Sequence, residues 1–363
     1  MATAHYLAKR HRVTVLEKQV VPGGNICTLN RNASAPSLPS NVYLDNGVIE
    51  FHQDHSPSFR SLIEELGLRL EPVTGGSTSI HLLNGKCLHM PGVIREKSTS
   101  ASERIRLYGS LAWALRYLGP VALRMSRSRR RENAPVGSFL GTDILSRWIR
   151  MLLMYGYSIP YNQIDDFPAR QAIQTLLQGF IGTKWARLKG GTYSYIAEII
   201  DQAGPNLNFE LGQAIGGVRR NTNGISVECT AGAIEADKLV FAVPPDQVLG
   251  MLADPDEDEV RWFSPWQANF ATTTVHTDEG VYSSWANSTF SEFDVFEKED
   301  GDAGYNAYLN RLSGEAESSE INYFLAYNMD EHIDPEKVLH VRRHHTPLYT
   351  AEAARSIPEI RAR

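Results

Sequence analysis

One acidic side chain stands where it could bind a nucleotide. Glu17 ends a short apolar run, Val13 to Leu16, which is typical of a strand in a parallel sheet. An acidic residue at the carboxyl end of such a strand can accept both hydroxyl groups of an adenosine ribose. Gly23 and Gly24 follow in a turn where bare backbone can approach a ligand closely. This order predicts part of a dinucleotide-binding unit, although an ordinary strand followed by a turn explains the same residues.

Histidines form a second group of candidates. On a predicted strand, His340 and His344 would face one side and His345 the other. No carboxylate or cysteine at ligand spacing accompanies them, so we predict no metal site. His276 and Asp278 would share one side of another strand and could form an acid–base pair. A strand end that enters a turn also explains that pair.

Aromatic residues are frequent in the middle of the chain. They could line a hydrophobic substrate pocket, and core packing explains them equally well. The residues are Trp148, Tyr155, Tyr157, Phe180 and Trp185.

The elements that must position these residues follow an order of β, helical and again β patterns. Residues 2–9 suit a helix that packs on the first strand, and helical spacing returns at 57–66 and within 100–185. Asn-Gly pairs predict hairpins in 42–51 and 78–92. Polar residues 292–302 predict an acidic loop. The other predicted strands are 207–211, 214–219, 225–229, 238–241, 268–277, 305–311, 321–327 and 338–345.

Length and composition limit the class of protein. A chain of 363 residues is long for a single core, so we expect two domains or one large domain with an insertion. The net charge of −6 gives no electrostatic support for nucleic-acid binding. The cysteines Cys27, Cys87 and Cys229 are widely spaced, which fits a reducing compartment, and no signal peptide is recognisable. We therefore expect a cytoplasmic protein.

Residues 107–125 form the longest apolar stretch. Arg116 and Gly119-Pro120 interrupt it, so a buried or amphipathic helix pair is favoured over a membrane span. The basic cluster Arg124 to Arg131 keeps peripheral contact with a membrane surface open. A solvated loop explains the same cluster.

Several sequence blocks, taken in order, carry a resemblance to a known superfamily. The chain resembles flavin-containing amine oxidases and phytoene-desaturase-like enzymes, and within them a group of predicted NAD/FAD-binding oxidoreductases. The blocks are VTVLEKQVVPGGN (13–25), LDNGVIEF (44–51), LKGGTYSY (188–195), KLVFAVPPD (238–246), VHTD (275–278) and VLHVRRHHTPLY (338–349).

The resemblance implies an α/β fold and specific cofactor contacts. It implies a Rossmann-like FAD-binding domain, here incomplete, with an inserted α+β substrate domain. The expected division is 1–75 with 186–250 for the first unit, and 76–185 with 251–363 for the second. Glu17 would bind the adenosine ribose, Gly47 would lie near the flavin ring, and the backbone of Ile215 would lie against the adenine. The residues expected along the ribose and pyrophosphate are Lys18, Gly23, Gly24 and Asn25.

The chain departs from the superfamily pattern at both ends. The opening strand and its G-x-G-x-x-G turn, whose N–H groups normally hold the pyrophosphate, are missing. So is the glycine-rich segment that would follow Arg363. We expect either a fragment or mispredicted gene product, or a fold that has been trimmed and reused.

Two functions remain open on these grounds. The first is an FAD-dependent oxidoreductase that oxidises a hydrophobic small molecule by hydride transfer, chemistry that the flavin supplies. The second is a flavin-free remnant of the same fold that acts as a binding protein or as a non-redox isomerase or cyclase. The retained Glu17 and glycine pairs favour the first function, and the two missing ends favour the second.

Overall fold

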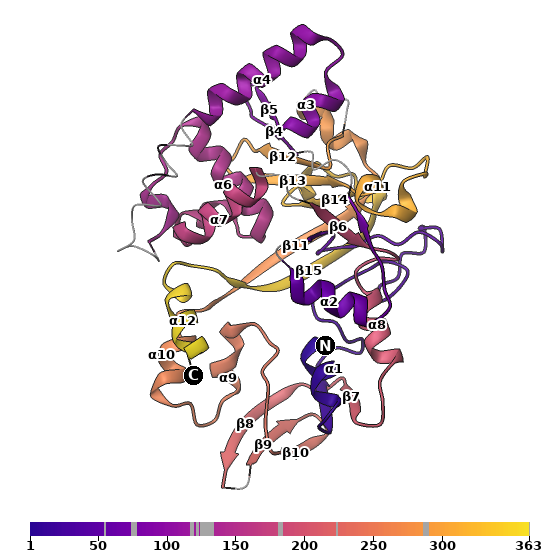
Figure 1. The fold of residues 1–363 in the computed structure, drawn as a ribbon, viewed down its shortest axis with the longest axis vertical. Coiled ribbons are helices and arrows are strands. Elements are labelled where there is room, and N and C mark those ends of the chain that lie inside the picture. Colours follow the sequence, from indigo (N-terminus) through magenta and orange to yellow (C-terminus); the bar gives the residue numbers. More distant parts are fainter. Residues whose placement is uncertain are drawn as a thin grey trace.

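A computed structural model gives the arrangement of the chain (Figure 1). It describes residues 1–362 except 54–55, 74–77, 117–119, 121–122, 124–133, 181–183, 223 and 286–289. The cluster Arg124–Arg131 and Asn223 of a predicted turn therefore lie outside the described residues, as does the side chain of Phe180. No helix among the described residues is long and apolar enough to cross a bilayer.

The predicted first strand is a member of a parallel pair. β1 (Val13–Glu17) follows the short helix α1 (Ala2–Ala8) and pairs in parallel with β7 (Leu207–Leu211). The parallel pairing is confirmed, but β1 is only partly buried. Between these strands in the sequence come α2 (Pro57–Glu65) and α8 (Ser194–Asp201), whose apolar faces share one core with Leu207.

A small antiparallel sheet continues from this pair at the bottom of Figure 1. It contains β8 (Ile215–Asn221), β9 (Gly224–Cys229) and β10 (Gly232–Ala236), which pack on the short helix α9 (Val248–Met251). The predicted strand at 238–241 is wrong, because the strand that follows β9 is β10 and residues 238–241 have no strand structure. The helix α10 (Glu257–Phe263) follows, with a capping box at Asp256.

The largest sheet of the described residues has seven strands and fills the upper half of Figure 1. Its order is β15-β11-β14-β13-β12-β4-β5, and β12 pairs with β4 in parallel while the other neighbours are antiparallel. The bounds are β4 (Thr78–His81), β5 (Cys87–His89), β11 (Gln267–His276), β12 (Phe293–Glu297), β13 (Ala303–Tyr308), β14 (Phe324–Tyr327) and β15 (Val338–Leu348).

Helices cover one side of this sheet. α6 (Ile144–Tyr157) supplies Trp148 to the main core, and Asp143 caps its first turn. α7 (Ala169–Phe180) follows the 3-10 turn that contains Asp165 and Asp166, so the predicted start at 167 is close to the observed one. α3 (Pro91–Lys97) and α4 (Ala101–Leu115) lie at the upper end of Figure 1, and α11 (Leu309–Leu312) lies at the right of the sheet. α12 (Ile357–Ala362) lies lower in the picture beside α10, where Glu359 pairs with Arg261.

Two predictions for single segments are wrong for the same reason. The hairpin at Asn46-Gly47 does not form: residues 42–50 are irregular, and only β2 (Phe51–His52) pairs, with β6 (Trp185–Leu188), in a sheet that β3 (Leu70–Pro72) completes. The acidic loop predicted at 292–302 contains β12, which lies inside the large sheet. In both segments polar side chains are used in long-range contacts instead of facing water. The hairpin at Asn84-Gly85 is confirmed, with Gly85 at φ +76°.

Candidate functional site

Glu17 lies at the carboxyl end of β1, at the edge of the parallel pair. One oxygen of its carboxylate accepts a hydrogen bond from the backbone N–H of Gln19 at 2.9 Å. Among the described residues this is the only hydrogen bond to that carboxylate, so the second oxygen is available to a ligand. The backbone carbonyl of Glu17 accepts from Gln213 N at 2.8 Å, which brings the start of β8 beside it.

Ile215 and Lys18 flank this carboxylate differently. Ile215 begins β8, at an irregularity of the strand, and packs in the same apolar cluster as Leu16. The Lys18 side chain is exposed. Packing thus holds Ile215 beside Glu17, while the Lys18 side chain extends toward solvent.

The paired glycines of the first turn have different surroundings. Gly23 has φ +130°, and a Cβ there would lie 3.1 Å from both Tyr193 and Ile196, at the start of α8. Gly24 has φ +60°, and a Cβ there would meet nothing within 4 Å. Gly23 is therefore required by close packing of the turn on α8, whereas Gly24 presents uncovered backbone.

Two side chains attach this turn to strand β15. Asn25 Nδ2 donates to the carbonyl of His345 at 2.8 Å, and His345 N donates to Asn25 Oδ1 at 3.3 Å. Arg342 Nη2 donates to the carbonyl of Gly24 at 2.9 Å and to Gln19 Oε1 at 3.4 Å. The segment from Glu17 to Asn25 is consequently held against the β15 strand of the large sheet.

Gly47 lies against the same strand, next to His344. With φ +138° and a neighbouring ring atom 2.9 Å from the position of a Cβ, this site admits only glycine without rearrangement. The third close atom is the carbonyl oxygen of Asn25, 3.5 Å away. The structure therefore brings Gly24, Asn25 and Gly47 together, although they are not neighbours in one element.

A buried network of hydrogen bonds fixes the neighbours of Gly47. Thr273 Oγ1 donates to Asn46 Oδ1 and forms a hydrogen bond of 2.8 Å with His344 Nε2. Asn46 Nδ2 hydrogen-bonds His340 Nδ1 at 2.9 Å. Burial, together with the charge of Arg342, lowers the pKa of His344 to about 4, and the same two causes lower the pKa of His340. His344 is therefore neutral at pH 7 and acts as a fixed hydrogen-bond donor to Thr273.

Asp45 connects two of the sequence blocks noted above. Its carboxylate accepts the N–H of Thr192 at 2.9 and 3.0 Å and the hydroxyl of Thr192 at 3.0 Å. The hydroxyl of Thr28 also donates to it and itself accepts from Tyr193 N at 2.9 Å. Burial raises the pKa of Asp45 to about 6 despite these donors, so the side chain is ionised at pH 7. The LDNG and KGGT segments are thus joined at one carboxylate.

A carboxyl group and several aromatic rings lie a few residues beyond Gly47. Glu50 Oε1 accepts a hydrogen bond from the hydroxyl of Tyr155 at 3.3 Å. The ring of Tyr155 contacts Phe293 at 4.4 Å and Tyr305 at 5.5 Å, and Tyr305 stacks on Tyr327. Burial, and then the negative charge of Glu292, raises the pKa of Glu50 to about 8. These rings belong to the main core or pack against it, and we call Tyr155, Phe293, Tyr305 and Tyr327 the aromatic cluster. With a pKa of about 8, Glu50 is mostly protonated beside this cluster at pH 7.

The remaining histidines have structural partners. His345 faces away from His340 and His344, as predicted, and its Nε2 lies 2.8 Å from Asp246. His276 accepts from Asp278 N at 3.1 Å, and burial lowers its pKa to about 4. Asp278 in turn receives Gly280 N, Asp334 N and Lys337 Nζ, so the arrangement is that of a strand end and turn rather than an acid–base pair. No group of three metal-ligating side chains occurs among the described residues.

The aromatic residues of the middle region divide between core and site. Trp148 is buried in the main core, and Tyr157 packs on Phe167 while its hydroxyl bonds Thr175. Trp185 belongs to β6 and contacts the ring of His52. Only Tyr155 reaches the carboxyl group of Glu50.

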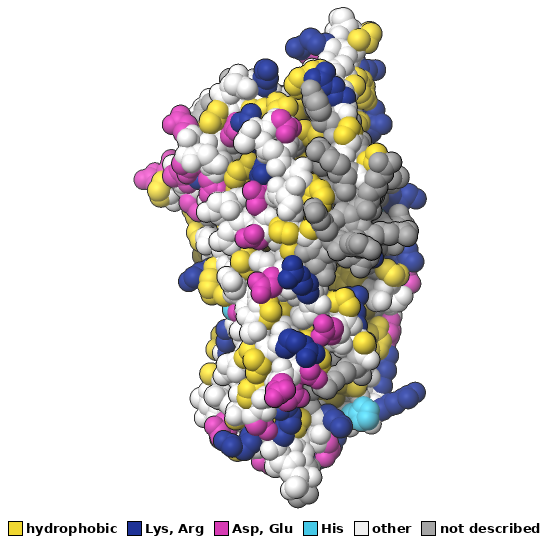
Figure 2. Space-filling view, turned by 90° about the vertical axis from the view of Figure 1, so that its left-hand side faces the viewer, with side chains coloured by type: hydrophobic (Ala, Val, Ile, Leu, Met, Phe, Trp, Pro, Cys, Tyr) yellow, Lys and Arg dark blue, Asp and Glu magenta, His cyan; other side chains and the backbone are white. Residues whose placement is uncertain are grey.

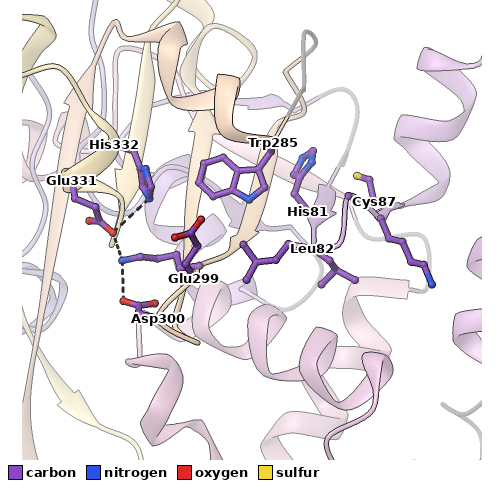
Figure 3. A pocket seen from close by; sticks show the side chains of 12 residues that line it. His81, Leu82, Cys87, Trp285, Glu299, Asp300, Glu331 and His332 are labelled. Carbon is purple, nitrogen blue, oxygen red and sulfur yellow. Dashed lines mark ion pairs between the residues drawn. The ribbon is translucent and has the colours of Figure 1, made fainter.

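A separate hollow of about 510 Å³ lies near β4 and β12, at the other end of the large sheet (Figure 3). His81, Trp285 and His332 contribute to its lining, and Lys298 pairs there with Glu331 and Asp300. The charge of Lys298 is thus compensated by acids that line the same hollow.

Some residues of the site are not among those predicted for it. Arg342, Asn46 and Thr273 make contacts that only the folded chain creates, because they come from segments more than 200 residues apart. The signals in the sequence were the LDNG block and the histidine-rich strand. The prediction connected the first with the flavin ring, and considered the second for metal binding without predicting a metal site. Neither block alone indicates that the two lie against each other.

Comparison with known proteins agrees with this geometry. Residues 1–104 match the model of the family described as flavin containing amine oxidoreductase. A search of curated proteins finds no match. Among solved structures, cyclohexylamine oxidase from Brevibacterium oxydans IH-35A is 12% identical with a TM-score of 0.64, over 98% of this chain and 87% of that one.

Two further structures share the fold. A CLA-producing fatty acid isomerase from P. acnes is 14% identical with a TM-score of 0.64, over 99% of this chain and 88% of that one. Putrescine oxidase bound to putrescine is 15% identical with a TM-score of 0.58, over 92% of this chain and 75% of that one. The chain thus has the α/β fold of the flavin-containing amine oxidoreductase superfamily, and its first 104 residues match that family in sequence.

Proposed function

We propose that this protein is an FAD-dependent oxidoreductase that oxidises a hydrophobic small molecule by hydride transfer to the flavin. The observation that carries the proposal is the attachment of the segment from Glu17 to Asn25, and of Gly47, to the same strand β15. The carboxylate of Glu17 has an oxygen available for a ribose hydroxyl, and an added Cβ at Gly24 would meet nothing within 4 Å, so the backbone there can approach a ligand.

The residues present fit the adenosine and ring portions of FAD. Glu17 would hold the ribose, with Ile215 against the adenine and Lys18 extending from the edge. Gly23, Gly24 and Asn25 would lie along the linker to the ring, and Gly47 near the ring itself. When bound, the flavin would supply the acceptor for the hydride.

The chain's own residues would position the substrate and exclude water. The aromatic cluster is apolar, and Glu50 beside it is mostly protonated at pH 7 because its pKa is about 8. A substrate that reaches this cluster would meet apolar rings, which favours a hydrophobic substrate over a strongly charged one. Asn46, Thr273 and His344 would keep Gly47 in place without contributing a charge.

A flavin titration tests the proposal. Purified protein is mixed with FAD, and binding is followed by flavin absorbance and fluorescence. Glu17→Gln removes the charge from the ribose contact, and because hydrogen bonds to charged groups contribute about 1.5–3 kcal/mol, we expect roughly tenfold to hundredfold weaker binding. Glu64→Gln, at a carboxylate on α2 that is 70% exposed, is the matched control and should bind like the parent.

The opposite result would identify the other function. A folded protein that stays colourless and binds no FAD would exclude flavin chemistry for this chain and favour a flavin-free binding protein, isomerase or cyclase. Tight FAD binding that Glu17→Gln leaves unchanged would keep the cofactor but refute the assigned ribose contact.

A further inference from the structure

Helix α4 presents large apolar side chains to solvent at the upper end of the molecule (Figure 1). Ile105 is 74% exposed, Trp113 is 46% exposed and Tyr108 is 36% exposed. Leu111, on the opposite side of the helix, is 5% exposed and faces the protein. At about 100° per residue, Ile105, Tyr108 and Trp113 share the outward half of the helix.

Basic side chains border this apolar face. Arg104 and Arg106 lie on its two sides, and the side chain of Arg106 is 72% exposed. The guanidinium of Arg116 lies over the ring of Trp113, 4.8 Å from its centre. Figure 2 shows hydrophobic and basic side chains together at this end of the molecule.

The local charge is opposite in sign to that of the whole chain. The net charge of the chain is −6, whereas residues 95–116 carry five basic and two acidic side chains, a net charge of +3. One of the two acids, Glu96, is paired with Arg311, and the other, Glu103, accepts from Thr99 and lies 3.9 Å from Arg106 Nη2. The outward face of α4 therefore combines apolar area with a net positive charge.

This combination suits an anionic lipid surface. A helix with an apolar stripe flanked by arginines lies in the interface of a bilayer, where its apolar side enters the headgroup boundary and its cations meet anionic lipids. The 15 residues of α4 span about 22 Å, too short to cross the hydrocarbon core. Tryptophan and tyrosine are the aromatic residues preferred at that interface.

We propose that the outward face of α4, with Ile105, Tyr108 and Trp113 and the flanking Arg104 and Arg106, binds the surface of an anionic lipid bilayer. The charge complementarity between these arginines and acidic headgroups selects this occupant. The inference goes beyond the proposed oxidation and does not depend on flavin binding.

Co-sedimentation with vesicles tests the inference on the full chain. We expect binding to vesicles of phosphatidylcholine with phosphatidylserine, weak binding to phosphatidylcholine alone, and a decrease with added salt. Ile105→Glu with Trp113→Glu, and separately Arg104→Glu with Arg106→Glu, should each reduce the partition coefficient roughly tenfold or more. These side chains are exposed, so the variants should retain the far-UV spectrum and melting temperature of the parent.

Matched controls place the effect on α4. Ile321→Glu changes an isoleucine that is 50% exposed elsewhere, and Arg355→Glu reverses an exposed arginine near the C-terminus; both should bind like the parent. Absence of vesicle binding, equal binding to both vesicle types, or unchanged binding of the α4 variants would each overturn the proposal. So would a lipid-free dimer that Ile105→Glu dissociates, since a second copy would then cover this face.

Discussion

The carboxylate of Asp45 accepts the backbone N–H of Thr192, with nitrogen–oxygen distances of 2.9 and 3.0 Å, across 147 positions of sequence. The same carboxylate accepts the hydroxyl groups of Thr192 and Thr28. Through this one side chain, the segment that leads to Gly47 is fixed to the turn that begins α8. The positions of Gly23 and Gly47 relative to each other depend on it, because Gly23 packs on α8.

Replacing Asp45 by asparagine should destabilise the fold. The amide keeps one acceptor but turns an NH₂ group toward donors, so at least one of Thr28 and Thr192 loses its partner. A buried donor without a partner costs about 1–3 kcal/mol, which we expect as the loss in the free energy of unfolding in urea. Asp201→Asn, at an exposed position at the end of α8, should change the free energy of unfolding by less than about 0.5 kcal/mol. Equal stability of the two variants would contradict the role given to Asp45.

Gly47→Ala should destabilise the fold more than an alanine substitution at another positive-φ glycine. The backbone at φ +138° costs about 1–3 kcal/mol for a side chain, and the new Cβ would overlap the ring of His344. Gly85→Ala, at φ +76° with nothing near the added atom, is the matched control and should cost only about 1–2 kcal/mol. Adding His344→Ala to Gly47→Ala should restore the part of the lost stability that is caused by overlap with the His344 ring. Equal melting temperatures of Gly47→Ala and Gly85→Ala would refute the close contact between Gly47 and His344.

Glu50 should give the folding stability a distinctive pH dependence. Its folded pKa of about 8 lies above the ordinary value of 4.5, so between these values the folded chain holds a proton that the unfolded chain releases. Stability contributed by this group is therefore complete below about pH 4.5 and decreases as the pH rises toward 8, by at most about 1.4 kcal/mol per pH unit.

Glu50→Gln should remove this decrease. Urea unfolding at several pH values between 5 and 8 would then show a flatter profile for the variant, while Glu64→Gln keeps the slope of the parent. Tyr155→Phe should extend the slope to higher pH, because the hydrogen bond from Tyr155 lowers the pKa of Glu50. Parallel profiles for the parent and Glu50→Gln would show that Glu50 ionises normally.

Local sequence patterns were sufficient for elements whose apolar residues repeat regularly. The period of helix α2, the turn at Asn84-Gly85 and the alternation along β11 each reflect a nearby physical cause, so the sequence predicts them well. The apolar run of β1 predicted a strand in a parallel sheet, but it did not indicate that β7 is the partner. Glu17 and Gly24, whose position depends on that strand and turn, were placed correctly at the strand end and in the turn.

Long-range polar contacts could not be predicted from local sequence patterns. Asn46-Gly47 has the composition of a hairpin turn, but Asn46 bonds His340 and Thr273 from distant strands, and Gly47 packs on His344. Residues 292–302 are rich in acids, but Asp294 is buried against His81. In each segment a partner more than 200 positions away satisfies a polar group that composition alone assigns to solvent.

The pair formed by His81 and Asp294 provides a test of that explanation. The two side chains lie 2.9 Å apart on the neighbouring strands β12 and β4, Asp294 is 0% exposed, and its other oxygen accepts Ser291 N at 2.8 Å. Asp294→Ala would leave His81 and Ser291 N buried without this hydrogen-bond partner, and each buried unpaired polar group costs about 1–3 kcal/mol, so the variant should lower the free energy of unfolding by at least that order. Asp294→Asn retains an acceptor for Ser291 and should cost less.

His81→Phe separates pairing from packing. The imidazole stacks on Phe296 with ring centres 4.9 Å apart, and a phenyl ring preserves that contact while it leaves Asp294 without its partner. Because each single change removes the same interaction, the double variant should be more stable than the sum of the two losses, with a coupling of about 1–3 kcal/mol. Strictly additive losses would mean that the two groups do not interact. The burial of β12 would then rest on its apolar residues alone, and the acidic composition of 292–302 would need another cause.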